Sequence, residues 1–213
     1  MRKETADELP RAFRERCDAL ARSYLAHPDD PRRQSGFGGG AARWRAEREP
    51  ILEAVDGHGS VLDVGCANGY LLECLVAWGR ERGLALEPFG VDRSAELVAL
   101  ARRRLPAWRD RFFVADAWSF RPPRRFDLVY TLFDCVPPTH LAAYLGRLAR
   151  RCVATGGRLA VGAYGSRSRG IAPIDPAGAL SDAGLRVVGA GAGGEGPLVR
   201  VAWADPEPEP AGR

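Results

Sequence analysis

The segment 61–70, with the sequence VLDVGCANGY, constrains the fold of this chain more than any other feature. Its first four residues are mostly apolar and predict a buried strand, and the two glycines that follow predict a tight turn with an accessible backbone. Amphipathic spacing begins directly after the turn, so a helix starts there and points its first N–H groups at the turn. This order is typical of an α/β domain that binds a ligand at the turn.

Downstream of this segment, short apolar runs alternate with amphipathic stretches to about residue 203. The expected strands are 61–64, 89–92, 112–115, 126–131, 158–164, 185–190 and 198–203. The glycine-rich stretch 189–196 has no room for a crossover helix, so the last two strands form a hairpin. The sequence predicts a three-layer Rossmann-like α/β sandwich, with a mostly parallel seven-stranded sheet and an antiparallel last strand.

Helical spacing is expected over 70–82, after the capping residue Ser94, and over 138–154, where glycines 156 and 157 are expected to end the helix. We expect residues 58–204 to form the ligand-binding domain and the Pro/Glu-rich segment 205–213 to be a disordered tail.

The first 57 residues lack the strand and helix alternation and are expected to form a helical lid over the domain. Their first helix carries an apolar stripe made of Phe13, Cys17, Leu20 and Tyr24. A loop with three consecutive glycines follows, and a second helix begins near residue 41. Within this lid, Tyr24, Arg43 and Trp44 are candidates for contacts with a bound ligand, although packing and surface roles explain them equally well.

Composition excludes several classes of protein. No apolar run approaches the roughly 20 residues of a membrane-spanning helix. The charged start of the chain does not resemble a secretory signal, so we expect a cytoplasmic protein with no membrane contact. The five cysteines are widely spaced and form no C-x-x-C pair, which argues against a disulfide framework and a metal site.

The net charge of +4 comes from one region. Positions 101–125 hold eight arginines and two aspartates. These arginines end a helix or precede strands, so we expect them at the sheet edge opposite the glycine turn. A nucleic-acid partner is therefore disfavoured.

The segment 61–70 resembles the SAM-binding motif of class I S-adenosylmethionine (SAM)-dependent methyltransferases, which reads strand-D-x-G-x-x-x-G-helix. The resemblance implies that the turn holds the methionine part of SAM and that Asp63 orients it. It also implies that Asp92, at the end of the second strand, accepts hydrogen bonds from the ribose. Asp116 and Ala117 would meet the adenine, with Trp118 against the ring. The implied cofactor-binding residues are Asp63, Gly65, Cys66, Ala67, Asn68, Gly69, Asp92, Arg93, Asp116, Ala117, Trp118 and Thr131.

Two ionisable residues follow the fourth strand and are candidate catalytic groups. Asp134 is a candidate base facing the acceptor, and His140 is a second candidate, although an exposed place in the first turn of a helix explains it equally well. The sequence here departs from the Asn/Asp-Pro-Pro-aromatic signature of many enzymes that methylate planar amino groups. Methyl transfer from a sulfonium mainly needs alignment and exclusion of water, so the lack of a catalytic dyad is no objection.

The resemblance implies a SAM-dependent methyltransferase that acts on an oxygen or nitrogen atom, or less readily a carbon atom, of a small molecule such as a specialised metabolite. Four alternatives remain open: an RNA methyltransferase, a nicotinamide-dependent oxidoreductase, a non-catalytic SAM-binding protein and an aminopropyl transferase. The four-residue glycine spacing, with Ala67 in between, disfavours a dinucleotide.

Overall fold

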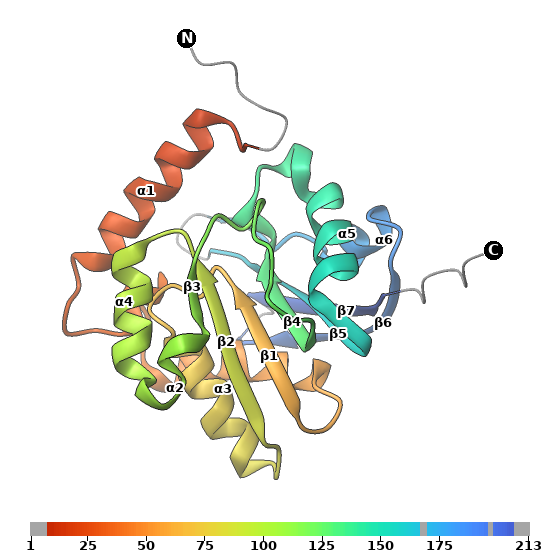
Figure 1. The fold of residues 1–213 in the computed structure, drawn as a ribbon, viewed down its shortest axis with the longest axis horizontal. Helices are drawn as coiled ribbons and strands as arrows, with labels where there is room; N and C mark the ends of the chain where they lie inside the picture. Colours follow the sequence, from red (N-terminus) through yellow and green to blue (C-terminus); the bar gives the residue numbers. More distant parts are fainter. Residues whose placement is uncertain (1–7, 167–169, 196–197, 207–213) are drawn as a thin grey trace.

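A computed structural model describes residues 8–166, 170–195 and 198–206 of the chain (Figure 1). It contains a seven-stranded sheet in the order β3-β2-β1-β4-β5-β7-β6. The strands are β1 Gly59–Val64, β2 Leu86–Asp92, β3 Phe112–Val114, β4 Phe126–Leu132, β5 Val153–Tyr164, β6 Arg186–Gly193 and β7 Val199–Asp205. The five neighbouring strands β3, β2, β1, β4 and β5 are parallel, and β7 runs antiparallel to both β5 and β6. The predicted fold class and the terminal hairpin are confirmed.

Helices cover both faces of the sheet (Figure 1). One face packs against α2 Ala41–Arg48, α3 Tyr70–Glu81, α4 Ala95–Arg104 and the 3-10 helix η2 Glu49–Ala54. The other face packs against α5 Leu141–Cys152 and α6 Pro176–Asp182. Helix α1 Arg11–Leu25 and four further 3-10 helices complete the described elements: η1 Arg33–Ser35, η3 Pro106–Arg111, η4 Phe133–Cys135 and η5 Pro138–His140.

Alternating side chains in the central strands build two separate cores. In β1, Leu62 and Val64 contribute to the core beneath α5 and α6, whereas Val61 contributes to the core beneath α3. In β4, Val129 contributes to the core beneath α5 and α6, and Leu128 to the core beneath α3. Successive strand residues point to opposite faces, so both faces of a covered sheet are apolar. The sequence of each central strand contains a continuous apolar run because both of its faces are buried.

The expected helix over 138–154 is wrong at its C-terminal end. Helix α5 ends at Cys152, and the chain passes directly into β5, so glycines 156 and 157 lie within a strand. A Cβ atom at Gly157 would lie 2.7 Å from the Asp127 carbonyl oxygen, where the pairing of β4 and β5 is irregular. Gly157 therefore permits a close approach between strands and does not end a helix.

Helix α6 was not among the expected elements. Asp175 caps it by accepting a hydrogen bond from the Ala177 N–H at 3.0 Å, and Pro176 occupies its first turn. Both residues are ordinary signals of a helix start. The helix is only seven residues long, which is too short to show a clear apolar period.

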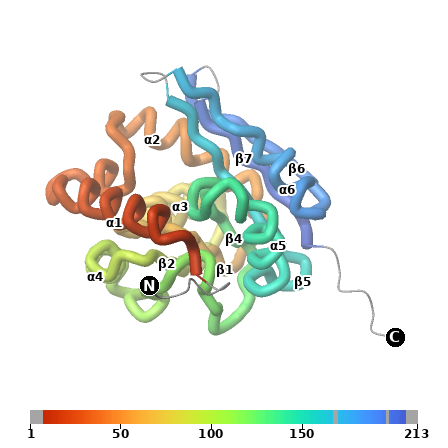
Figure 2. Tube along the Cα trace, turned by 90° about the horizontal axis from the view of Figure 1, so that it is seen from above, coloured from red at the N-terminus to blue at the C-terminus, as the bar shows by residue number. Residues whose placement is uncertain are grey.

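The N-terminal segment lies across the edge of the sheet at which the parallel strands end. Viewed from above, α1 passes over this edge near β1 and β2 (Figure 2). Arg93, directly after β2, donates to the Arg14 carbonyl oxygen at 3.0 Å and pairs with Asp18 at 3.1 Å. None of the described helices has the length and hydropathy needed to cross a membrane. Most of the expected tail, residues 207–213, lies outside the described residues.

Candidate functional site at the carboxyl edge of the sheet

The turn between β1 and α3 has the conformation that the glycines were expected to allow. Gly65 and Gly69 have φ angles of 91° and 73°, and Ala67 has a φ of 45°, which is uncommon for a residue with a Cβ atom. The N–H groups of Gly65 and Cys66 donate to the Val91 carbonyl oxygen at 2.8 and 3.0 Å. The turn is thereby fixed to the end of β2.

Gly65 and Gly69 lack a side chain for different reasons. A Cβ atom at Gly69 would lie 2.9 Å from the Ala101 side chain, so this glycine lets the start of α3 approach α4. A Cβ atom at Gly65 would meet only the Cys135 sulfur, at 3.0 Å. Gly65 is therefore the one that leaves the turn open towards the end of β4.

Asp92 connects the turn to α4. One carboxylate oxygen accepts a hydrogen bond from the Ala67 N–H and the other from the Ser94 N–H, both at 2.9 Å. Ser94 caps α4 by accepting from the Leu97 N–H. Burial raises the pKa of Asp92, and these backbone hydrogen bonds oppose the rise. Each oxygen keeps a further acceptor position for a ligand.

Asp63 is a buried carboxyl group with no hydrogen-bond partner among the described residues. Its exposed fraction is 3%. Burial, and then the charge of Asp92, raises its pKa to about 7. Buried carboxylates are normally hydrogen-bonded or paired, so the end of β1 presents an acceptor that a cationic or N–H-bearing ligand group could satisfy.

Asn68 fastens the N-terminal segment to the turn. Its side chain is fully buried and donates to the Pro31 carbonyl oxygen and to Gln34, both at 3.0 Å. Its amide oxygen accepts from the Ser35 hydroxyl at 2.7 Å and from the Tyr70 N–H at 3.1 Å. The side chain of this expected cofactor residue is therefore occupied by the protein.

Tyr24 of α1 lies over the carboxyl edge, where it was a candidate for ligand contact. Burial, followed by the nearby Asp134 and Asp92 carboxylates, raises its pKa to about 12. Asp134, in η4, is exposed, although partial desolvation of its carboxyl group raises its pKa. A neutral phenol from the N-terminal segment thus lies near the acids that follow β2 and β4.

Arg48 is a site residue that the sequence did not indicate. Its guanidinium is buried, pairs with Glu47 at 3.1 Å and lies 4.0 Å from the centre of the Tyr164 ring. It lowers the pKa of Tyr24 and of Tyr130, opposing the rise caused by burial. A buried positive charge therefore lies near the carboxyl ends of β4 and β5. Arg48 is one of eleven basic residues before position 60, and nothing in its spacing distinguishes it.

The other two lid candidates have packing roles. Trp44 is buried, and its indole N–H donates to the Cys74 sulfur at 3.3 Å. Arg43 pairs with Glu47 at 2.6 Å, and its guanidinium lies 5.2 Å from the centre of the Phe37 ring.

The residues that follow β3 form a turn around a buried indole. Asp116 accepts from the Trp118 N–H at 2.9 Å, and Ala117 lies between them, half-buried. Arg147 stacks over Trp118 at 4.1 Å, and His140 meets the indole edge with the ring centres 5.2 Å apart. The indole N–H is buried without a partner among the described residues.

Three expected site residues have their main contacts within the protein. Thr131 is fully buried, with its hydroxyl 2.8 Å from the Tyr144 hydroxyl. Arg93 holds α1, as described above. His140 contacts Thr139 at 3.0 Å and packs on Trp118. No group of histidine, cysteine and acidic residues suited to a metal ion occurs in the described part of the chain.

All eight arginines of residues 101–125, the basic cluster, were expected at the sheet edge opposite the glycine turn. This expectation is wrong for Arg104. Its guanidinium donates to the Asn68 carbonyl oxygen at 3.2 Å and pairs with Glu73 at 3.0 Å, beside the glycine turn. Arg111, in contrast, pairs with Glu87 near the start of β2, at the opposite edge. The close contact between α3 and α4 at Gly69 brings Arg104 to the turn.

Comparisons with known proteins agree with this geometry. Residues 61–157 match the model of a methyltransferase domain family. No curated protein matches the chain by sequence. The chain is similar to solved structures, among them a putative methyltransferase of Haloferax volcanii in complex with the Trm112 methyltransferase activator. That match has a TM-score of 0.61 and 17% identity, and covers 94% of this chain and 100% of the other.

Two further structures are similar. The complex of DhpI with S-adenosylhomocysteine (SAH) has a TM-score of 0.59 and 20% identity, with coverage of 91% and 98%. The mitomycin 7-O-methyltransferase MmcR has a TM-score of 0.61 and 18% identity, with coverage of 91% of this chain and 67% of the other. Residues 61–157 therefore match a methyltransferase domain family, and the fold of the chain is similar to that of solved methyltransferase structures.

Proposed function

We propose that this chain is an enzyme that transfers a methyl group from SAM to an oxygen or nitrogen atom of a small molecule. The observation that carries the proposal is the pair of acids that flanks an open glycine turn, the buried Asp63 and the half-buried Asp92. Asp63 has no partner among the described residues, and each oxygen of Asp92 keeps an acceptor position.

The residues present fit SAM at this edge. Asp63 would accept from the amino group of its methionine part, and Asp92 from its ribose hydroxyls. Arg48 would supply positive charge for its carboxylate. The turn around Asp116, with the buried indole of Trp118, would border its adenine. When bound, SAM supplies a methyl group already activated by a sulfonium.

The chain's own task is then alignment and exclusion of water. Tyr24 and Asp134 lie where the N-terminal segment meets the end of β4, and we assign them to the acceptor side of the site. Asp134 is exposed in η4, and its carboxylate could take up the proton of an acceptor as the methyl group is transferred. His140 packs on Trp118, and we assign it the role of positioning that indole.

A small acceptor fits a site that the chain's own N-terminal segment covers. The similar mitomycin 7-O-methyltransferase acts, by its name, on an oxygen of a small molecule. Nucleic acid remains disfavoured, because most of the contacts of the basic cluster lie at the other edge of the sheet.

Thermal denaturation tests cofactor choice. SAM and SAH are expected to raise the melting temperature, whereas NADH is not, because a ligand that binds only the folded state stabilises it by about 2.7 kcal/mol at a hundredfold excess over Kd. A screen of phenols, amines and carboxylic acids with labelled SAM would then identify the acceptor class. A larger shift with NADH would contradict the proposal, and transfer only to RNA would replace the small-molecule acceptor.

We further propose that residues 1–57 act as a lid on the catalytic domain and that Asn68 holds this lid in place. Replacing Asn68 by alanine removes four hydrogen bonds and leaves buried partners such as Gln34 unsatisfied, each costing about 1 to 3 kcal/mol. Hydrogen exchange of residues 28–36 is therefore expected to speed up while β4 and β5 remain protected. Ser35→Ala, which removes one of the four bonds, is expected to have a smaller effect. Unchanged hydrogen exchange in residues 28–36 would show that Asn68 does not hold the lid.

A further inference from the structure

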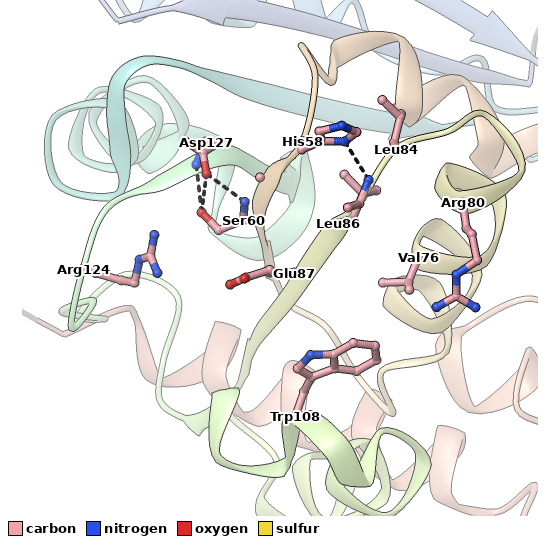
Figure 3. Close-up of a pocket in the computed structure, with 12 residues that line it drawn as sticks. His58, Ser60, Val76, Arg80, Leu84, Leu86, Glu87, Trp108, Arg124 and Asp127 are labelled. Atoms are coloured by element: carbon pink, nitrogen blue, oxygen red, sulfur yellow. Dashed lines mark hydrogen bonds between the residues drawn. The ribbon is translucent and has the colours of Figure 1, made fainter.

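A cavity lies at the amino edge of the sheet, the edge opposite Asp63 and Asp92. Its volume is about 620 Å³, within the range of small-molecule pockets. It lies between α3, η3 and the first residues of β1 and β2 (Figure 3). None of its lining residues belongs to the candidate cofactor site.

One part of the cavity wall is apolar and includes a flat aromatic ring. Trp108 of η3 is half-buried, and its indole lies below the start of β2 in Figure 3. The lining has apolar side chains from Val76, Leu84, Ala85, Leu86 and Trp108. Aromatic side chains gain contact energy by stacking on other planar groups, so this wall suits a planar apolar body.

The charged groups of the lining differ in whether they are engaged. Glu87 pairs with Arg111 at 3.0 Å, and Asp127 accepts two hydrogen bonds from Ser60, each 2.7 Å. Arg80 and Arg124, in contrast, form no ion pair with any described residue, and the one hydrogen bond of Arg124 is to the Arg125 carbonyl oxygen. The cavity therefore offers two guanidinium groups with donors to spare.

We propose that this cavity is a second ligand site, separate from the methyltransferase site, and that it takes a small planar aromatic anion such as an aromatic carboxylate. The ring of the ligand would lie against Trp108, and its carboxylate would accept from Arg80 or Arg124. Guanidinium groups bind carboxylates through paired, charge-assisted hydrogen bonds. A nucleic-acid strand fits less well, because Glu87 and Asp127 interrupt the basic surface.

Calorimetric titration with two matched probes, 2-naphthoate and its neutral analogue 2-naphthamide, tests the site on the full chain. We expect 2-naphthoate to bind with a Kd at least about tenfold lower than that of 2-naphthamide, because the amide has no negative charge and only one acceptor oxygen for a guanidinium group. Saturating SAH is expected to leave the 2-naphthoate affinity unchanged, since the two sites lie at opposite edges. Competition by SAH would assign the probe to the cofactor site and overturn the proposal.

Two double variants locate the binding. Arg80→Gln with Arg124→Gln is expected to weaken 2-naphthoate binding about tenfold or more, and both side chains are exposed, so folding is not at risk. Arg103→Gln with Arg121→Gln removes the same charge from exposed positions outside the cavity and is expected to leave the Kd unchanged. Equal losses in both variants, no measurable binding, or displacement by a short RNA would overturn the proposal.

Discussion

Replacing Asp92 by alanine is expected to weaken SAM binding about ten- to several-hundredfold. Each charge-assisted hydrogen bond to a ribose hydroxyl contributes about 1.5 to 3 kcal/mol in a buried setting. The structure adds a second effect, because the same carboxylate holds the Ala67 N–H of the turn and the Ser94 N–H at the start of α4. The variant should therefore also lose about 1 to 2 kcal/mol of unfolding free energy.

Calorimetry and urea denaturation separate these two effects. Glu96→Ala is the matched control, since Glu96 is the acid in the first turn of α4 and contacts Ser94 without touching the turn. It should reduce stability slightly, through the helix dipole, and leave SAM affinity unchanged. Asp92→Asn, which keeps one acceptor oxygen, should fall between alanine and the wild type. Unchanged affinity in Asp92→Ala would remove this residue from the cofactor site.

The sequence predicted the fold well because its signals were local and repeated. Buried parallel strands require continuous apolar runs, and these marked most strands to within a few residues. The stretch 189–196 predicted the hairpin of β6 and β7 because a crossover helix needs more residues. The prediction failed at glycines 156 and 157, where a close approach between strands uses the residue type that also ends helices.

The site was only partly predictable, for a different physical reason. Asp63, Gly65 and Asp92 lie at strand ends, so their places follow from the chain order of a parallel sheet. Arg48 depends on how α2 packs over the end of β5, a contact between residues more than 100 positions apart. Asn68 lies in the expected turn, but its partners Pro31 and Gln34 come from a loop whose path has no sequence signature.

Asp63 is expected to make the stability of the protein fall as the pH rises from about 4 to about 7. Burial and Asp92 raise its folded-state pKa to about 7 from the ordinary value of 3.8, so the folded state holds a proton that the unfolded state loses. Stability falls with pH wherever the folded state binds more protons, and about three pKa units correspond to about 4 kcal/mol. Above pH 7 the folded protein therefore carries an ionised, unpartnered and buried carboxylate.

Asp63→Asn removes this charge, so at pH 8 the variant should be more stable than the wild type, by up to about 4 kcal/mol in urea denaturation, with little difference near pH 4. Asp127→Asn is the control, because it should change the stability at pH 8 in the opposite direction. Burial alone would raise the pKa of Asp127, but hydrogen bonds from Ser60 lower it overall, so its replacement should reduce stability at pH 8.

The same carboxyl group should make SAM binding depend on pH. A cationic amino group beside Asp63 favours its ionised form. With a pKa of about 7 in the free protein, the ionised fraction of Asp63 rises from about a tenth at pH 6 to about nine tenths at pH 8, so the wild-type affinity for SAM should rise by up to about tenfold in all over this range. In Asp63→Asn the affinity should be weaker and nearly independent of pH over this range. A variant that gains stability at pH 8 but keeps the wild-type affinity and pH profile would show that Asp63 is buried at the end of β1 without contacting the cofactor.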